Sequence, residues 1–263
     1  MRPLKLLFAG FFCFFLACQK EPDETLTPAT CKLDKILIHQ GNSNPQDTIS
    51  IEYSGEQVSR INYSDFYVVP EFFSNGLVAR KKYYPRGTTD LMRIDQYTYN
   101  PDSTLAKVEA FAAGGGQQAP QPTYRYVFSW SAKQLTKLEF LADTSGTGVV
   151  PITEETFTYA GNNISQVIYL EHEDQYKDTT NFFYDSNLNY FQRNPVLILS
   201  DIFFMDFTGF AMAFSLSLNN VTSFDLNHPS TTTILTRSET DKQQIESLTV
   251  DGELYSRYQY KCQ

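Results

Sequence analysis

The chain has 263 residues, with 30 acidic against 21 basic side chains, and its formal net charge at pH 7 is −9. This balance excludes nucleic acid as a partner, because affinity for nucleic acid comes from Lys and Arg side chains that displace counterions from phosphates. The length fits one β domain, which can reach roughly 250 residues, or two smaller domains.

The N-terminus has the layout of a secretory signal peptide. Arg2 and Lys5 provide a positive start, residues 6–17 form a twelve-residue apolar run, and Cys18 follows directly. Such a run is too short to cross a bilayer, since a transmembrane helix needs about 20 apolar residues. We therefore expect residues 1–17 to be removed.

Residues 15–18, Phe-Leu-Ala-Cys, resemble a bacterial lipobox, in which the cysteine is acylated and becomes the new first residue. The resemblance predicts lipidation at Cys18, and the several acyl chains of a lipoprotein hold it firmly to a membrane. An ordinary cleaved signal peptide with Cys18 unmodified is the alternative. Residues 19–24 resemble the signal that sends Bacteroidetes-type lipoproteins to the outside of the outer membrane. Without such a signal, the charges and proline are those of a solvated tether, and in either case we expect residues 18–30 to be an acidic tether.

Two cysteines remain after this processing, Cys31 and Cys262. In an oxidising compartment, such an isolated pair is more often bridged than free. We expect a Cys31–Cys262 disulfide, with two unpaired buried thiols as the alternative. The bridge would tie the first strand to the last.

Residues 31–263 are expected to form a single domain built of β-hairpins. Several segments share one pattern: an aromatic residue, four or five mostly polar residues, and then two aliphatic residues spaced three apart. The clearest copies begin at Tyr53, Tyr99, Trp130 and Tyr159. Gly, Asn, Asp and Pro in the gap suit tight turns, so each unit is typical of a hairpin. No long helical pattern separates the units, which argues against parallel βαβ crossovers.

The strands that lead into the turns alternate sharply. In residues 124–130 every second side chain is aromatic, and the strand period of two puts all four on one buried face. A large meander with one apolar face must curl or fold to hide its edges. The sequence therefore predicts an all-β protein, a large antiparallel β-meander that closes into a barrel-like sheet. Its other face is polar, which favours water outside rather than a lipid-facing band.

Two segments interrupt the meander. Residues 114–122, rich in Gly, Gln and Pro, are expected to be a flexible loop between two strands. Residues 195–214 carry few charges and no strict alternation. We expect one short helix or plug segment near 195–206, with the helix at about 196–205, at the end of the barrel. Two buried strands or an exposed partner-binding patch are the alternatives.

Several motifs carry a family resemblance: Cys-Lys-Leu-Asp-Lys-Ile at 31–36, Phe-Thr-Tyr-Ala-Gly-Asn-Asn-Ile-Ser at 157–165, and the terminal Tyr-Gln-Tyr-Lys-Cys. With the tyrosine-led hairpins, they resemble Bacteroidetes lipoprotein domains of unknown function with a porin-like β fold. The resemblance covers most of residues 31–262 and implies a meandering, barrel-like sheet. It brings no activity and no catalytic residue. The hairpins also resemble the YD repeats of secreted toxins, although the Gly and Asp-Gly positions of those repeats are mostly missing.

No motif for catalysis or for binding a metal or cofactor stands out in the sequence. His39, His172 and His228 are far apart, and there is no HExxH, CxxC, Gly-rich phosphate loop or Gly-x-Ser-x-Gly elbow. We therefore expect no metal, no cofactor and no catalytic residue, and a hydrolase is the weakest alternative.

Exposed aromatic side chains can stack on sugar rings, and Tyr67, Tyr83 and Tyr84 are the candidate ligand-binding residues. Trp130 is a further candidate, but its place in the repeat puts it in the core-facing register. The expected function is that of a lipid-anchored lipoprotein at the cell surface that binds a glycan or another envelope partner. A structural envelope component without a small-molecule ligand is the alternative.

Overall fold

The computed structural model describes residues 31–113, 122–143, 148–190, 209–226, 231–240 and 244–262. The predicted signal peptide, the lipidation site Cys18 and the tether lie outside the described residues. So do most of the predicted loop at 114–122 and the predicted helix at 196–205. The described residues contain no helix with the length and apolar character that a membrane span requires.

The described residues form sixteen β-strands and one short helix, and neighbouring strands pair in antiparallel fashion. The strands are β1 Cys31–Ile38, β2 Asp47–Ser54, β3 Gln57–Asn62, β4 Phe66–Phe72, β5 Val78–Pro85, β6 Arg93–Tyr99, β7 Leu105–Ala112, β8 Tyr124–Ser131, β9 Gln134–Ala142, β10 Val150–Ala160, β11 Asn163–Glu171, β12 Lys177–Leu188, β13 Asn219–Asp225, β14 Thr232–Glu239, β15 Ile245–Val250 and β16 Glu253–Cys262. The helix, α3, spans Gly209–Leu216.

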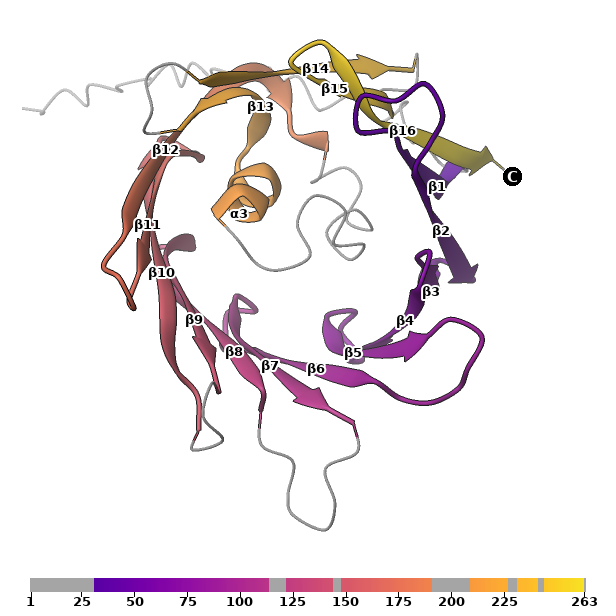
Figure 1. The fold of residues 1–263 in the computed structure, drawn as a ribbon, viewed down its shortest axis with the longest axis horizontal. Helices are drawn as coiled ribbons and strands as arrows, with labels where there is room; N and C mark the ends of the chain where they lie inside the picture. Colours follow the sequence, from indigo (N-terminus) through magenta and orange to yellow (C-terminus); the bar gives the residue numbers. More distant parts are fainter. Residues whose placement is uncertain are drawn as a thin grey trace, which may run out of the picture.

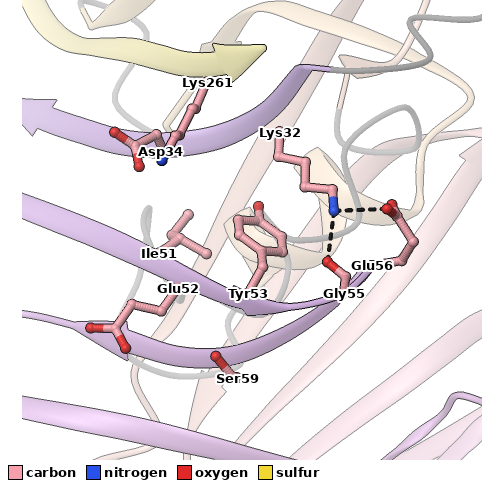
Figure 2. Close-up of a pocket in the computed structure, with 9 residues that line it drawn as sticks. All are labelled: Lys32, Asp34, Ile51, Glu52, Tyr53, Gly55, Glu56, Ser59 and Lys261. Carbon is pink, nitrogen blue, oxygen red and sulfur yellow. Dashed lines mark hydrogen bonds and ion pairs between the residues drawn. The ribbon is translucent and has the colours of Figure 1, made fainter. Parts of the chain in front are cut away.

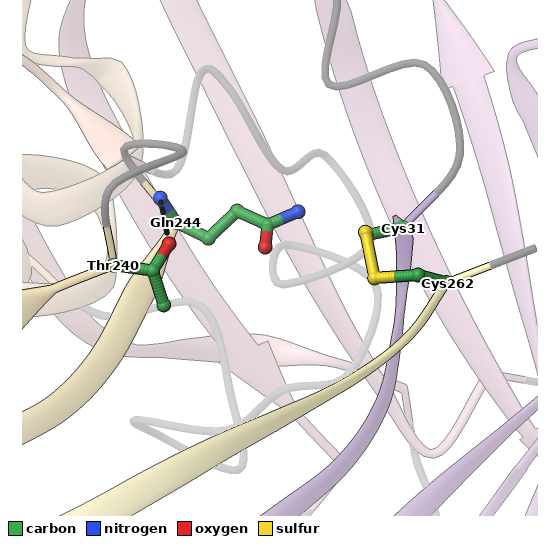
Figure 3. The surroundings of a disulfide bond; sticks show 4 residues. All are labelled: Cys31, Thr240, Gln244 and Cys262. Carbon is green, nitrogen blue, oxygen red and sulfur yellow. Dashed lines mark hydrogen bonds between the residues drawn. A yellow bond between two sulfur atoms is a disulfide. The ribbon is translucent and has the colours of Figure 1, made fainter.

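Strand order follows the chain from β1 to β16, and β16 then pairs with β1, so the sheet is a closed barrel (Figure 1). Cys31 and Cys262 lie directly opposite each other in this last pair. Their sulfurs form the disulfide shown in Figure 3, with the two Cα atoms 3.8 Å apart. The predicted all-β, closed meander is confirmed, and the structure contains the predicted bridge.

Alternate side chains of the strands point into the barrel and form one apolar core together with α3. Met212 and Phe214 of α3 belong to the same buried cluster as Tyr126 and Phe128 of β8. Figure 1 shows α3 inside the ring of strands, where it contacts β11 and β13. The buried face of the meander is therefore the inner wall of the barrel.

The outer face of the barrel carries ion pairs that cross between strands. Val108 of β7 is buried in the core, and its neighbours Lys107 and Glu109 point the other way. The Glu109 carboxylate lies 2.6 Å from Lys107 Nζ and 2.6 Å from Arg125 Nη2 of β8. These pairs are partly exposed, so each contributes little stability, but they show that the outer face suits water.

β-Bulges explain why the two aliphatic residues of each hairpin unit are three positions apart instead of two. In the β8–β9 hairpin the register shifts between Ser129 and Trp130. A bulge places one extra residue in one strand, so side chains three positions apart can share a face. Leu135 and Leu138 of β9 are both buried accordingly. The β2–β3, β6–β7 and β10–β11 hairpins have the same shift beside their leading tyrosines.

The leading aromatic side chains also tie each hairpin to the one before it. In three units the phenol donates a hydrogen bond to a backbone carbonyl, and in one unit the Trp130 indole does so. These bonds are Tyr53 Oη to Leu33 O at 2.9 Å, Tyr99 Oη to Val78 O at 3.0 Å, Tyr184 Oη to Ile164 O at 2.6 Å and Trp130 Nε1 to Leu105 O at 2.7 Å. In the Tyr159 unit the phenol oxygen instead accepts from the Leu135 N–H. Each of these hydrogen bonds joins two neighbouring strands beyond the point where their backbone pairing ends.

Replacing Tyr99 by Phe removes one of these ties and leaves the Val78 carbonyl without its donor. We expect the free energy of unfolding to fall by about 1 to 2 kcal/mol, the usual cost of leaving such a group unsatisfied. Urea denaturation measures the change. Tyr84→Phe, at an outward-facing position, is the matched control and should cost less than about 0.5 kcal/mol. Equal losses in the two variants would contradict a structural role for the tie.

Candidate functional site

The three candidate tyrosines do not share a face of the barrel. Tyr67 of β4 and Tyr84 of β5 are register partners on the outer face, and their rings stack with centroids 4.9 Å apart and planes 12° apart. Tyr83 points to the inner wall and is only 5% exposed. The expectation that Tyr83 is an exposed ligand-binding residue is therefore wrong, because adjacent residues of a strand point to opposite faces. Trp130, as expected, packs against the core.

Tyr67 and Tyr84 end a row of side chains that crosses five strands. Successive register pairs join Lys35 of β1, Ser50 of β2, Asn62 of β3, Tyr67 and Tyr84. Residues facing each other across strands are close enough for their side chains to interact. The row is therefore one continuous surface on the outside of the barrel.

Two further side chains complete this surface. The Asn62 amide donates to Ser50 Oγ at 3.3 Å and to Glu52 Oε1 at 2.9 Å. Arg60, the register partner of Glu52, places its guanidinium carbon 3.6 Å from the centroid of the Tyr67 ring. We call this surface the outer band and define it as Lys35, Ser50, Glu52, Arg60, Asn62, Tyr67 and Tyr84.

The Tyr67 ring is held firmly in the outer band. Arg60 reaches it from β3 and Tyr84 from β5, the strands on either side of β4. The Tyr67 hydroxyl also donates to the Thr88 carbonyl at 3.1 Å. A cation over an aromatic face contributes about 0.5 to 1 kcal/mol at an exposed site. The Arg60 guanidinium and the rings of Tyr67 and Tyr84 therefore form an ordered stack that needs no ligand to hold it together.

The chemistry of the outer band matches that of a sugar. A carbohydrate hydroxyl both donates and accepts hydrogen bonds, and the band supplies donors from Arg60 and acceptors from the Asn62 amide oxygen and from Glu52. Tyr84, the last ring of the stack, supplies apolar surface for the C–H face of a sugar ring, and the tyrosine hydroxyls add polar atoms. Planar polar side chains and aromatic rings of this kind can hold a ligand by hydrogen bonding and stacking.

A polar cavity of about 550 Å³ adjoins the outer band between β1 and β2 (Figure 2). It opens where the β1–β2 pairing ends at Lys35 and Ser50. Its lining is Lys32, Asp34, Ile51, Glu52, Tyr53, Gly55, Glu56, Ser59 and Lys261. Glu52 thus belongs to both the cavity and the outer band.

One end of the cavity is fixed by internal contacts. Figure 2 shows Lys32 reaching Gly55 and Glu56, with Nζ 2.7 Å from the Gly55 carbonyl oxygen and 2.8 Å from Glu56 Oε1. Burial, and then the negative charge of Asp34, raise the pKa of Tyr53 to about 12. Tyr53 therefore stays a neutral phenol at physiological pH and keeps its hydrogen bond to Leu33. The described residues hold no group of three His, Cys, Asp or Glu side chains suited to a metal ion.

Sequence reasoning found two of the seven residues of the outer band. It missed Lys35, Ser50, Glu52, Arg60 and Asn62, which are ordinary polar residues of strands when taken one by one. The two-residue turn between β2 and β3 is a signal that brings Glu52 near Arg60, but the bulge between Glu52 and Tyr53 shifts the register by one residue. Strand pairing brings the seven residues of the outer band together, and the composition of the individual strands does not reveal them.

No family model matches this chain, and no curated protein sequence matches it. The chain is similar in structure to a porin-like protein from Bacteroides vulgatus ATCC 8482, with a TM-score of 0.49, 11% identity, and 88% of this chain and 98% of that one covered. A porin-like protein from Bacteroides uniformis ATCC 8492 has a TM-score of 0.38, 12% identity, and coverage of 88% and 96%. A DUF3836 family protein from Bacteroides vulgatus ATCC 8482 has a TM-score of 0.28, 16% identity, and coverage of 34% and 93%. All three TM-scores are below 0.5.

Proposed function

We propose that this protein is a lipid-anchored envelope lipoprotein that binds a carbohydrate through its outer band and has no enzymatic activity. The observation that carries the proposal is the row of side chains across β1–β5. It combines stacked tyrosines with Arg60, Asn62 and Glu52 on one outward surface. The adjoining polar cavity extends the surface on which a polymer can lie.

The N-terminal sequence and the outer face support the envelope location. The apolar run that stops at Cys18 supports a lipid anchor, and the residues after it support export to the outer surface of the outer membrane. The charged outer face, with its ion pairs around Glu109, supports a barrel surrounded by water and held to the membrane only by its lipid. A polymer outside the cell could then reach the outer band.

Affinity electrophoresis against a panel of neutral and acidic polysaccharides tests carbohydrate binding. We expect at least one polysaccharide to retard the protein. Tyr67→Ala with Tyr84→Ala should weaken that binding at least tenfold, which corresponds to about 1.4 kcal/mol. Tyr176→Ala removes a tyrosine that is 50% exposed in the turn between β11 and β12, so it is the matched control. Absence of retardation by every polysaccharide, or equal retardation of both variants, would contradict the proposal.

Replacing Cys18 by Ala tests the anchor separately. We expect the variant to move from the membrane fraction to the soluble fraction, because the acyl chains supply the membrane affinity. Fractionation followed by immunoblotting measures the shift, and labelled fatty acid should enter the wild type only. A variant that still sediments with membranes, together with a wild type that takes up no label, would rule out the anchor.

A further inference from the structure

A second cavity, of about 380 Å³, lies inside the barrel and is separate from the outer band. The inner face of β5–β8 forms one of its walls, and α3 forms the other. Its lining is Val78, Lys81, Tyr97, Tyr99, Ser103, Thr104, Leu105, Phe128, Trp130, Met212, Ser215 and Leu216. We call it the lumen pocket. Its volume lies within the roughly 300 to 1,000 Å³ of small-molecule sites, which are found at the mouths of β-barrels among other places.

The aromatic side chains of the lumen pocket are fixed by the backbone of the barrel. The Tyr99 hydroxyl donates to Val78 O at 3.0 Å, and Trp130 Nε1 donates to Leu105 O at 2.7 Å. These bonds use the polar atoms of both side chains, so a ligand meets the carbon atoms of their rings. Such a preordered apolar wall lowers the cost of ordering side chains on binding.

The hydroxyl groups that line the lumen pocket also donate within the protein. Ser215 Oγ donates to Ala211 O of α3 at 2.6 Å, and Thr104 Oγ1 donates to Asp102 Oδ1 at 2.7 Å. Ser103 is exposed in the turn between β6 and β7, so it marks the mouth of the pocket. A polar ligand group that entered beyond this mouth would lose its water without gaining a matched partner, which is costly.

The charge beside the lumen pocket is engaged with the protein. Lys81 is the one charged side chain among the described residues that line it, and it is 3% exposed. It faces Asp95 across the β5–β6 pair, and its Nζ lies 5.9 Å from the centroid of the Tyr97 ring. Burial raises the pKa of Asp95, and the charges of Arg93 and Lys81 oppose that rise. Because Asp95 already answers this cation, the pocket offers no open charge to an ionic ligand.

We propose that the lumen pocket binds a compact, uncharged, apolar molecule between its aromatic wall and α3. The rings of Tyr99, Phe128 and Trp130 cover one side of the molecule, and Met212 and Leu216 of α3 cover the other. The affinity comes from the removal of apolar surface from water, which requires no polar partner. This site goes beyond the carbohydrate function proposed for the outer band and is independent of it.

Trp130 makes the proposal directly testable, because it is the single tryptophan of the chain and lines the pocket. The Cys18→Ala protein, purified without detergent, is titrated with bromocamphor, a compact uncharged molecule whose bromine quenches indole fluorescence at contact. We expect saturable quenching, which camphor without bromine relieves by competition, and one site by calorimetry. Free tryptophan is the control for collisional quenching and should show no saturation.

A charged analogue tests the chemistry of the ligand. Bromocamphorsulfonate has the same rigid body with a permanent negative charge. We expect it to bind at least tenfold more weakly than bromocamphor, because enclosure of its body brings the sulfonate out of water. This comparison needs no variant of the pocket.

Two variants then locate the site, with circular dichroism as the check on folding. Val78→Phe places a ring in the pocket from β5, and Ser215→Phe does so from α3. Each should reduce the affinity for bromocamphor at least tenfold. Tyr84→Ala alters the outer band and should leave this affinity unchanged, which separates the lumen pocket from the carbohydrate site.

Absence of saturable quenching, or quenching that camphor does not relieve, would overturn the proposal. Equal affinity for bromocamphor and its sulfonate would overturn the uncharged ligand. Unchanged affinity in folded Val78→Phe and Ser215→Phe proteins would place the ligand elsewhere and also overturn the proposal. Loss of carbohydrate binding in the Tyr67 and Tyr84 variants has no bearing on these outcomes, so the two proposals fail independently.

Discussion

Removal of the Cys31–Cys262 disulfide is expected to lower the free energy of unfolding by roughly 2 to 5 kcal/mol. The two cysteines are separated by 231 positions in the sequence, so the bond restricts almost the whole described chain in its unfolded state. In the chain-entropy treatment a loop of this length contributes on the order of 5 kcal/mol. The bond also joins the first and last strands, the pair that closes the barrel.

Urea denaturation of the Cys31→Ala, Cys262→Ala double variant measures this loss. Wild-type protein unfolded in the presence of a reducing agent is the control, and it should match the double variant within error. Non-reducing peptide mapping should find the Cys31–Cys262 cross-link in wild-type protein from the membrane fraction. Two free thiols there, or an unchanged unfolding midpoint in the double variant, would contradict a stabilising closure.

Replacing Asp95 by Ala is expected to destabilise the barrel by about 3 to 5 kcal/mol. Asp95 is 5% exposed on the inner wall, and its two carboxylate oxygens each lie 2.9 Å from an Arg93 nitrogen. Without the carboxylate, the buried Lys81 loses the acid opposite it, and the partly exposed Arg93 loses its ion-pair partner. Removal of one partner of a buried pair is costly because the charge left behind has no compensation.

A surface ion pair supplies the matched control for Asp95. Glu71 of β4 pairs with Lys82 of β5 on the outer face, where the side chains are partly exposed to water. Glu71→Ala should therefore cost only about 0 to 1 kcal/mol. Thermal or urea unfolding compares the two variants. Equal losses would show that Asp95 lies in a hydrated environment and would contradict the buried pair.

The architecture was predictable because two independent features of the sequence agree on it. Alternating aromatics at 124–130 require a buried face, and a cysteine at each end of the domain indicates that the ends meet. The three-residue spacing of the aliphatic residues in each hairpin was recognised in the sequence, but its cause was not. The cause is the bulge beside each leading aromatic residue, which at Trp130 places Leu135 and Leu138 on one face. The repeated sequence pattern therefore corresponds to a repeated local structure, the bulged hairpin.

The error at Tyr83 has a definite physical source. In β5 the alternate positions Lys81 and Tyr83 face inward while Lys82 and Tyr84 face outward. Both faces thus carry one lysine and one tyrosine, so hydrophobicity does not distinguish them. Only pairing with β4 and β6 decides which face is buried, and that pairing depends on register.

The ionic group of the inner wall was missed for a related reason. Lys81, Arg93 and Asp95 are residue types that are almost always exposed unless paired. Lys81 faces Asp95 across the β5–β6 pair, and Arg93 pairs with Asp95 within β6. No short sequence motif indicates such an arrangement. The position of α3 against β11 and β13 could not be predicted either, since the sequence does not show which wall a helix inside a barrel approaches.

Hydroxyl-radical footprinting with and without the polysaccharide that retards the protein most strongly is the most direct test of the outer band. The account predicts that bound polysaccharide protects Tyr67 and Tyr84 from oxidation. Tyr176, which is half exposed between β11 and β12, should stay equally reactive and serve as the internal control. Oxidation of Tyr67 and Tyr84 that is unchanged by a bound polysaccharide would contradict carbohydrate binding at the outer band.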